Sequence, residues 1–344
     1  MPGTNPAEAM RVIAGELPDF PYLPELPDRG PGADLTGRTA ALLVDMAVEV
    51  TPRGWRLAER PGRDLARARS MLSSDLDAFE EVLDGFRGPV KVQLCGPWTL
   101  AATLELPHTM NVAIADPGAV ADLTASLAEG AAAFAADVGK RVPGARLVVQ
   151  FDEPALPVVA EGMVPTASGL SRLAAVEAHT LRERLEQVLT ATHAYTMVHC
   201  CAPSVPFGII RAAGADGVAF DLSQLRRGEE DAVAESAEAG MGLLTGAVPA
   251  VPDQAVGGTG SSGASGSSGQ AGAAGGPRET AERVIRLWRR LGLSLATCAE
   301  QTVITPACGL AGVSPAQARS ALTRCREAAS ILPELIEETG GESL

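Results

Sequence analysis

The segment "YTMVHCCAPSV", residues 195–205, joins an apolar, β-branched run to His199, Cys200 and Cys201. The chain has only four histidines and six cysteines in 344 residues, so three of these side chains in a row mark this segment. Such a run is typical of a buried strand that ends at its polar residues. Because successive side chains of a strand point to opposite faces, His199 and Cys201 share one face. We therefore predict that His199 and Cys201 form a ligand pair and that Cys200 packs against a helix.

Further runs along the chain show the same strand pattern. The strand candidates are "AALLVDMAVEV" (40–50), "PVKVQLCG" (89–96), "ARLVVQFDE" (145–153), "AYTMVHCC" (194–201), "DGVAFDLS" (216–223), "GMGLLTGAV" (240–248) and "EQTVITPAC" (300–308). Amphipathic helical patterns lie between them, and this alternation predicts a parallel sheet covered by helices. Seven strands in this rhythm favour a (β/α)₈ TIM-type barrel whose first strand is missing or shortened. No GxGxxG motif follows a first strand and no GxxxxGK[ST] motif is found, which argues against a nucleotide-binding, doubly wound sheet.

One low-complexity segment interrupts the pattern. Residues 257–276, "GGTGSSGASGSSGQAGAAGG", consist almost wholly of Gly, Ser and Ala, and cannot bury enough apolar surface to offset their ordering entropy. The segment after it begins with the amphipathic helix "ETAERVIRLWRRLGL", which needs a partner surface. We therefore predict one domain over residues 1–344, with a flexible, disordered loop inserted at 257–276.

Composition excludes several classes of partner. The net charge is −14, so there is no basic surface to neutralise the phosphates of a nucleic acid or an anionic membrane. No apolar run reaches the roughly 18 residues that a spanning helix needs, and the start is polar. We therefore predict a cytoplasmic protein that binds neither nucleic acid nor membrane. In that compartment the cysteines stay reduced and serve as ligands or core residues.

Side chains that can bind metal or substrate follow several of the predicted strands. Barrel enzymes keep their active sites at the carboxyl ends of the strands, and here four of these ends carry a carboxylate, an imidazole or a thiol. The set is Asp152 and Glu153, then His199 and Cys201, then Asp221, and last Cys308. Zinc accepts nitrogen, sulfur and oxygen donors in a tetrahedral arrangement. We therefore predict a zinc site formed by His199, Cys201, Asp221 and Cys308.

The remaining candidates have simpler interpretations. A cysteine is among the most often buried residues, and we assign Cys95, Cys298 and Cys325 to the core. His108 lies in a loop and is either catalytic or solvated, and Asp45 and Glu49 either face the barrel mouth or end a strand.

The motifs together resemble a known family. "QFDEPALP", "MVHCCAPS", "ADGVAFDLS" and "VITPACGL" are similar, in order and approximate spacing, to the catalytic barrel of cobalamin-independent methionine synthase. "LCGPWTLA" resembles the Gly-Pro-x-Thr turn of the same barrel. The resemblance covers nearly the whole chain apart from the Gly/Ser-rich segment.

The resemblance implies an S-methyltransferase that forms methionine. The family binds one zinc ion through a histidine, two cysteines and a glutamate, which fall on His199, Cys201, Cys308 and, in place of glutamate, Asp221. The thiol of homocysteine joins the zinc, and its amino group meets Asp152. We add Glu153 and Glu49 to the predicted substrate-binding residues. Zinc binds the thiolate form of a thiol whose ordinary pKa is about 8.5, and so supplies a nucleophile at neutral pH.

Three departures from the family leave alternatives open. Asp221 is one methylene shorter than glutamate, so it ligates zinc directly, ligates through water, or leaves three protein ligands. The family's long members carry an additional amino-terminal barrel that helps bind a polyglutamylated folate, and this chain resembles the short, single-barrel form. The methyl donor is then methyltetrahydrofolate or a methylcorrinoid carried by another protein. The chain begins with "MPGT" where the family's first strand finishes its Gly-Ser-x-Pro turn, so we expect that strand upstream of Met1 or a patched barrel.

Rival functions follow from the same residues. One is a corrinoid-dependent methyltransferase that acts on another thiol, and Asp152 favours an amino-acid acceptor over it. Another is a barrel without catalytic activity that binds metal or a partner. A decarboxylase of the related porphyrin-processing fold needs no zinc, and the thiol and imidazole side chains argue against it.

Overall fold

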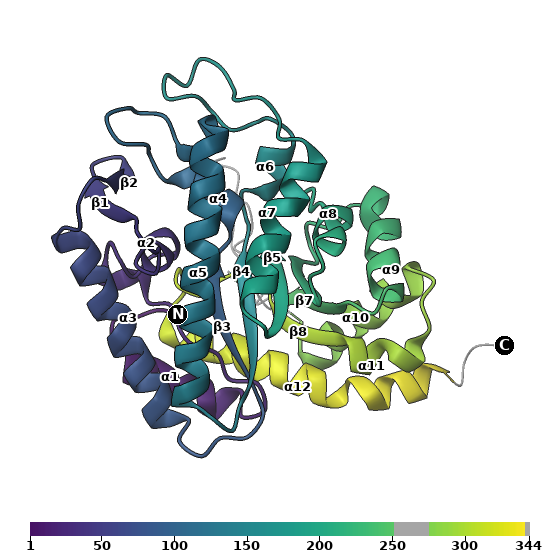
Figure 1. Cartoon of the computed structure of the whole chain (residues 1–344). Coiled ribbons are helices and arrows are strands. Elements are labelled where there is room, and N and C mark those ends of the chain that lie inside the picture. The colour runs from purple at the N-terminus through teal and green to yellow at the C-terminus, as the bar shows by residue number, and fades with distance from the viewer. Residues whose placement is uncertain (251–274, 341–344) are drawn as a thin grey trace, which may run out of the picture.

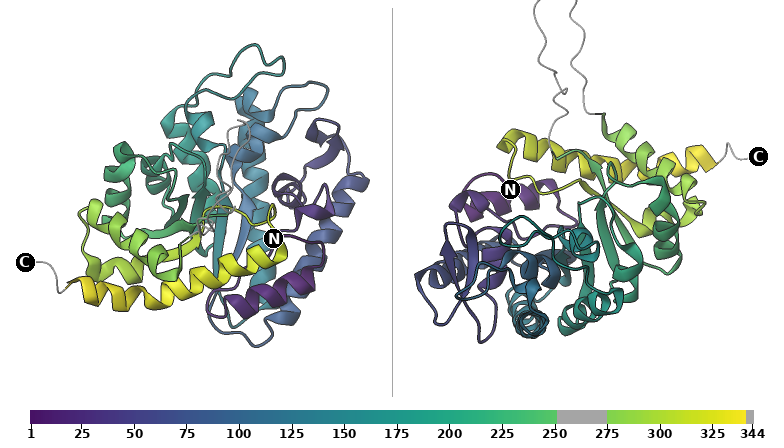
Figure 2. Two further views of the ribbon diagram at one scale, coloured as in Figure 1. Left: turned by 180° about the vertical axis from the view of Figure 1, so that it is seen from behind. Right: turned by 90° about the horizontal axis from the view of Figure 1, so that it is seen from above.

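A computed structural model describes residues 1–250 and 275–340. Its centre is a curled sheet of parallel strands in chain order, surrounded by helices (Figures 1 and 2). The strands are β3 (Pro89–Cys95), β4 (Arg146–Asp152), β5 (Tyr195–Cys200), β6 (Gly217–Asp221), β7 (Gly242–Val248) and β8 (Thr302–Pro306). Each coincides with a predicted strand. The predicted loop at 257–276 lies outside the described residues except for Gly275 and Gly276.

These strands form a half-barrel, and the α/β architecture predicted from the alternation of strands and helices is confirmed. The helices are α1 (Pro6–Glu16), α2 (Leu35–Ala40), α3 (Arg63–Val82), α4 (Pro97–Thr103), α5 (Pro117–Arg141), α6 (Leu156–Ala160), α7 (Ala178–Ala191), α8 (Phe207–Ala212), α9 (Glu230–Glu238), α10 (Pro277–Arg290), α11 (Cys298–Gln301) and α12 (Pro315–Gly340). Short 3₁₀ turns are η1 (Pro27–Arg29), η2 (Ala113–Ala115), η3 (Arg227–Glu229) and η4 (Leu295–Thr297). The (β/α)₈ TIM-type barrel with a missing or shortened first strand stays a prediction.

Helix α5 shows how local sequence starts an element and how packing completes it. The Asp116 side chain accepts hydrogen bonds from the backbone N–H groups of Gly118 and Ala119, and Pro117 occupies the first helical position. Among the described residues, α5 is also the one helix that is long and apolar enough to cross a membrane. The search for an uninterrupted apolar run in the sequence missed it, because polar residues interrupt its apolar ones. Its apolar window is 56% buried inside the fold, which is typical of a core helix in a soluble protein.

The predicted barrel strand at 40–50 is wrong. Helix α2 occupies its beginning, and its end forms β1 (Ala47–Thr51), which pairs antiparallel with β2 (Gly54–Ala58) in a separate hairpin. The turn between them requires Gly54, whose φ of 134° lies in the region that L side chains avoid. Apolar content alone could not reveal this turn.

A proline-rich segment lies beside β3 instead. The backbone N–H of Leu23 donates to the carbonyl of Lys91 at 2.9 Å, and the N–H of Lys91 donates to the carbonyl of Pro21 at 3.0 Å. This is a short parallel pairing centred on Tyr22 and Lys91. The segment extends the half-barrel at its β3 edge.

The two faces of the sheet bury different side chains. The outer face packs against the helices in the main core. The inner face carries a small separate apolar cluster, made by Val148, Met197, Ala219 and Leu244 with Phe20 packed against it. Because side chains alternate along each strand, every second residue beyond Val148 on β4 and Met197 on β5 lies on this same inner face. These residues are Gln150 and Asp152 on β4, and His199 on β5. A polar layer therefore follows the apolar cluster towards the carboxyl ends of the strands.

Candidate functional site

Two cysteines that are far apart in the sequence meet at the carboxyl end of the sheet. Cys201 follows β5 directly, and Cys308 lies two residues after β8. Their Sγ atoms are 3.4 Å apart, although 107 positions separate them along the chain. Cys201 is partly buried and Cys308 is exposed. Two sulfur atoms bound to one tetrahedral zinc at about 2.3 Å each would be roughly 3.8 Å apart, so this spacing is close to that of a metal-bound pair.

The contact makes the two thiols unequal. The hydrogen bond with Cys201 lowers the pKa of Cys308 to about 6, against the effect of its partial burial, and the positive charge of His199 adds to this lowering. The same shared proton raises the pKa of Cys201. The contact therefore favours the thiolate form of Cys308, and a thiolate is the form of cysteine that binds metal and attacks carbon.

His199 is held by a carboxylate on the neighbouring strand. Its Nδ1 lies 2.7 Å from Oδ1 of Asp152, which also accepts a hydrogen bond from Gln150 at 2.7 Å. Burial alone would lower the pKa of His199, but the hydrogen bond and the charge of Asp152 outweigh it and raise the pKa. A carboxylate on one ring nitrogen fixes the orientation of the imidazole, and leaves Nε2 as the nitrogen that can bind a metal.

Asp221 ends β6 but is engaged in its own loop. Its Oδ1 accepts hydrogen bonds from the backbone N–H of Ser223 at 2.8 Å and from the Ser223 hydroxyl at 2.7 Å. Within residues 1–250 and 275–340, no three His, Cys, Asp or Glu side chains form a group that could hold a metal ion. The structure therefore brings together Cys201 and Cys308, places the charge of His199 near them, and leaves Asp221 in a turn.

Glu153 faces away from these residues. It is fully buried, and its carboxylate accepts hydrogen bonds from the backbone N–H groups of Trp98 and Thr99 and from the Thr99 hydroxyl. Burial raises the pKa of Glu153 to about 7, although these hydrogen bonds act in the opposite direction. Both oxygens are thus used to hold the first turn of α4, and the predicted contact with substrate stays a prediction.

Glu49 lies on the β1–β2 hairpin. Its Oε1 accepts a hydrogen bond from Nε of Arg56 at 3.0 Å, across the antiparallel pair. This pairing is the cross-strand contact of opposite charges expected on a hairpin surface. A role for Glu49 in substrate binding also stays a prediction.

Two charged residues near Asp152 were not identified from the sequence. Glu25 follows the proline-rich segment, and burial raises its pKa. The charge of Asp152 adds to this rise, whereas the positive charges of Arg38 and Lys91 oppose it. Lys91 lies on β3, with Nζ 5.2 Å from the centre of the Tyr22 ring and 3.4 Å from Oε1 of Gln93. Burial lowers the pKa of Lys91. The alternation in "PVKVQLCG" places Lys91 and Gln93 on one face of the strand, so the sequence pattern could have located Lys91. The segment "LPELP" has no strand pattern and could not have located Glu25.

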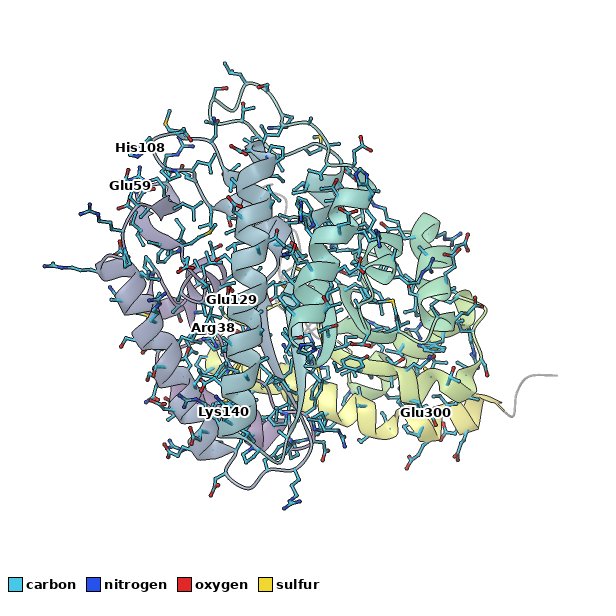
Figure 3. The ribbon with its side chains drawn as sticks, viewed as in Figure 1. Arg38, Glu59, His108, Glu129, Lys140 and Glu300 are labelled. Atoms are coloured by element: carbon cyan, nitrogen blue, oxygen red, sulfur yellow. The ribbon has the colours of Figure 1, made fainter. Side chains whose placement is uncertain are left out.

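The other cysteines and His108 are now located. Cys95, Cys200, Cys298 and Cys325 are buried, which confirms their predicted packing roles. Burial also raises the pKa of Cys200 to about 12, so it stays a thiol. His108 lies in the outer loops, with Nε2 3.0 Å from the Glu59 carboxylate, and both side chains are exposed (Figure 3).

Comparison with known proteins finds a similarity of fold. No protein-family model and no curated protein matches this chain. In the class of α/β proteins built on a curled parallel sheet, the fold is similar to a solved B12-independent methionine synthase from Shewanella sp. W3-18-1 in complex with selenomethionine. The TM-score is 0.51 and the sequence identity 15%, over 76% of this chain and 67% of that chain. At this identity the similarity concerns the fold alone.

Proposed function

We propose that this protein is a zinc-dependent S-methyltransferase that transfers a methyl group to the thiol of homocysteine and forms methionine. The observation that carries the proposal is the 3.4 Å approach of Cys201 and Cys308 at the carboxyl end of the sheet. The fold similarity to a methionine synthase points in the same direction. The proposal also includes a (β/α)₈ TIM-type barrel with a missing or shortened first strand, of which the half-barrel described above is a part.

The donor set suits zinc. Cys201, Cys308 and Nε2 of His199 would hold the ion, and Asp221 would complete the set directly or through water after releasing Ser223. When bound, zinc would favour the thiolate form of an incoming thiol.

The chain's own residues would orient the amino acid. Asp152 keeps His199 in place through Oδ1, which leaves Oδ2 for the ammonium group of the substrate. Glu25, whose titration responds to Asp152, would offer a second carboxylate. The positive charge of Lys91 would favour the ionised form of Glu25, since opposite charges stabilise each other at low dielectric.

Zinc content tests the proposal. Wild-type protein purified without chelator is expected to hold close to one zinc per chain, and Cys308→Ser to lose it. Cys325→Ser is the matched control, because Cys325 is buried in α12. A wild type without zinc would contradict the proposed site.

Methionine formation tests the reaction. Homocysteine is supplied with methyltetrahydrofolate in one assay and with methylcobalamin, or a methylcorrinoid protein, in another. Product with either donor supports the transferase and identifies the methyl source. If zinc-loaded protein methylates a thiol without an amino group as fast as homocysteine, the amino-acid acceptor is wrong.

A further inference from the structure

A pocket of about 300 Å³ opens beside the end of β6, and neither Cys201 nor Cys308 lines it. One side is formed by strand ends, with Asp221, Ser223 and Gly246 among the lining residues. The other side is formed by Arg283, Arg286 and Arg290 of α10. We call it the arginine pocket. Its volume is at the lower end of the range of small-molecule sites.

The three arginines lie on one side of the helix. Positions 283, 286 and 290 recur at intervals of three and four residues, which places them in one row about 10 Å long. The opposite side of α10 is buried, with Val284 and Trp288 in the core. The row is therefore held in place by a helix that is anchored against the sheet.

Each guanidinium keeps hydrogen-bonding capacity. Arg283 pairs with Glu279 at 3.1 Å, Arg286 with Glu282 at 3.7 Å and Arg290 with Glu230 at 2.9 Å, each through one nitrogen. A guanidinium carries five N–H donors, so these contacts leave donors for a ligand. The three acidic partners do not line the pocket, whereas the three arginines do.

The charge inside the pocket is opposite to that of the molecule. Three arginines and one aspartate line a pocket in a protein of net charge −14. One oxygen of Asp221, Oδ1, accepts both hydrogen bonds from Ser223. Such a chain repels anions at long range, so an anion that binds here must be held by specific donors. Arginine forks match the geometry of carboxylate and phosphate oxygens.

The floor of the pocket is backbone at a strand end. A Cβ on Gly246 would lie 2.7 Å from Cα of Ala307 and 2.8 Å from the carbonyl oxygen of Phe220, so only glycine fits there. Barrel proteins frequently bind phosphate groups through the loops that follow their last strands. The arginine pocket has this position, after β6, β7 and β8.

We propose that the arginine pocket binds the oxyanion groups of a small polyanion, carboxylate or phosphate, through Arg283, Arg286 and Arg290. The length of the row accommodates two or more such groups on one ligand. The pocket shares Asp221 with the proposed zinc site. Binding to the arginines is nevertheless measured without turnover, so its failure is distinguishable from failure of the methyltransferase proposal.

Calorimetric titration of the full-length protein tests the site with two probes, inorganic pyrophosphate and the peptide triglutamate. We expect binding of at least one probe to weaken at least about tenfold in the double variant Arg283→Gln/Arg286→Gln, since each charged hydrogen bond contributes on that scale. Raising the salt concentration should weaken binding further, because exposed charges are screened. Preference between the probes distinguishes a phosphate from a carboxylate ligand.

Arg289→Gln is the matched control. Arg289 lies on the same helix but does not line the pocket, and its Nη2 donates to the carbonyl of Thr339 at 3.3 Å. Unchanged binding in Arg289→Gln, with loss in the double variant, supports the site. No binding of either probe to the wild type, or equal loss in the control and the double variant, would overturn it. Thermal unfolding of each variant verifies that the fold persists, and zinc content, measured in the same samples, reports separately on the proposed function.

Discussion

At the residue scale, the two adjacent cysteines of the opening segment have opposite environments. Cys200 is fully buried on the outer face of β5, while Cys201 lies against Cys308. Strand alternation therefore predicts which sulfur can reach a metal, and it does so without any conserved motif.

Substitution of each cysteine separates the two roles. Cys201→Ala should lose bound zinc, because one of the two sulfur donors is removed. Cys200→Ala should retain zinc and lose about 1 kcal/mol of stability, the common cost of a single core substitution. Metal analysis and urea unfolding of both proteins measure these outcomes. Equal zinc in both variants would show that Cys201 is not a ligand.

At the element scale, the sequence predicted the strands that form the sheet better than those outside it. Each β-branched run that now lies in β3 to β8 was identified, because apolar strands of a covered parallel sheet give a strong pattern. The run at 40–50 failed because it joins the end of α2 to a hairpin. Pro21–Leu23 was missed because its prolines suppress the strand pattern, although its free backbone groups still pair with Lys91.

The candidate site was predictable to a similar extent. Residues at or just beyond the ends of strong strands, such as Cys201 and Cys308, were identified together because parallel strands end on one side of a sheet. The direction of a side chain after the strand ends depends on loop contacts, which the sequence pattern does not contain. Glu153 turns towards α4 and Asp221 towards Ser223 for this reason.

The contact between β4 and α4 gives a prediction for pH. The pKa of Glu153 is about 7 in the folded protein and ordinarily about 4.5. The folded state thus binds this proton more tightly, so the contribution of Glu153 to stability is present below pH 4.5 and is lost as the pH rises through 7. Relative to Glu153→Gln, which lacks this titration, the free energy of unfolding of the wild type should fall by roughly 3 kcal/mol between pH 4 and pH 8.

Urea unfolding of both proteins across this range measures the difference, in which the other titrating groups largely cancel. A difference that is constant with pH would mean that Glu153 keeps an ordinary pKa in the fold.

At the scale of the whole molecule, a buried charge cluster joins the amino-terminal elements to the half-barrel. Arg38 of α2 and Asp75 of α3 form an ion pair, with exposures of 1% and 0%, and Arg29 reaches the same carboxylate at 2.8 Å. Next to Arg38, the Thr39 hydroxyl accepts a hydrogen bond from the backbone N–H of Cys95 at the end of β3. The cluster thus fixes α2 between an outer helix and the edge of the sheet.

Breaking this pair should weaken the whole fold. Asp75→Ala removes the nearest counter-charge of the buried Arg38, which then keeps only Glu25 at 4.0 Å. We expect a loss of about 3–5 kcal/mol in the free energy of unfolding. The double variant Arg38→Met/Asp75→Leu removes both charges and replaces them with apolar side chains, so it should recover most of that loss. Urea unfolding, with one cooperative transition required for each protein, measures both values. A single variant as stable as the wild type would show that the charges do not hold α2 in place. A double variant as weak as the single one would place the effect in side-chain packing or in Arg29, which loses the same carboxylate in both variants.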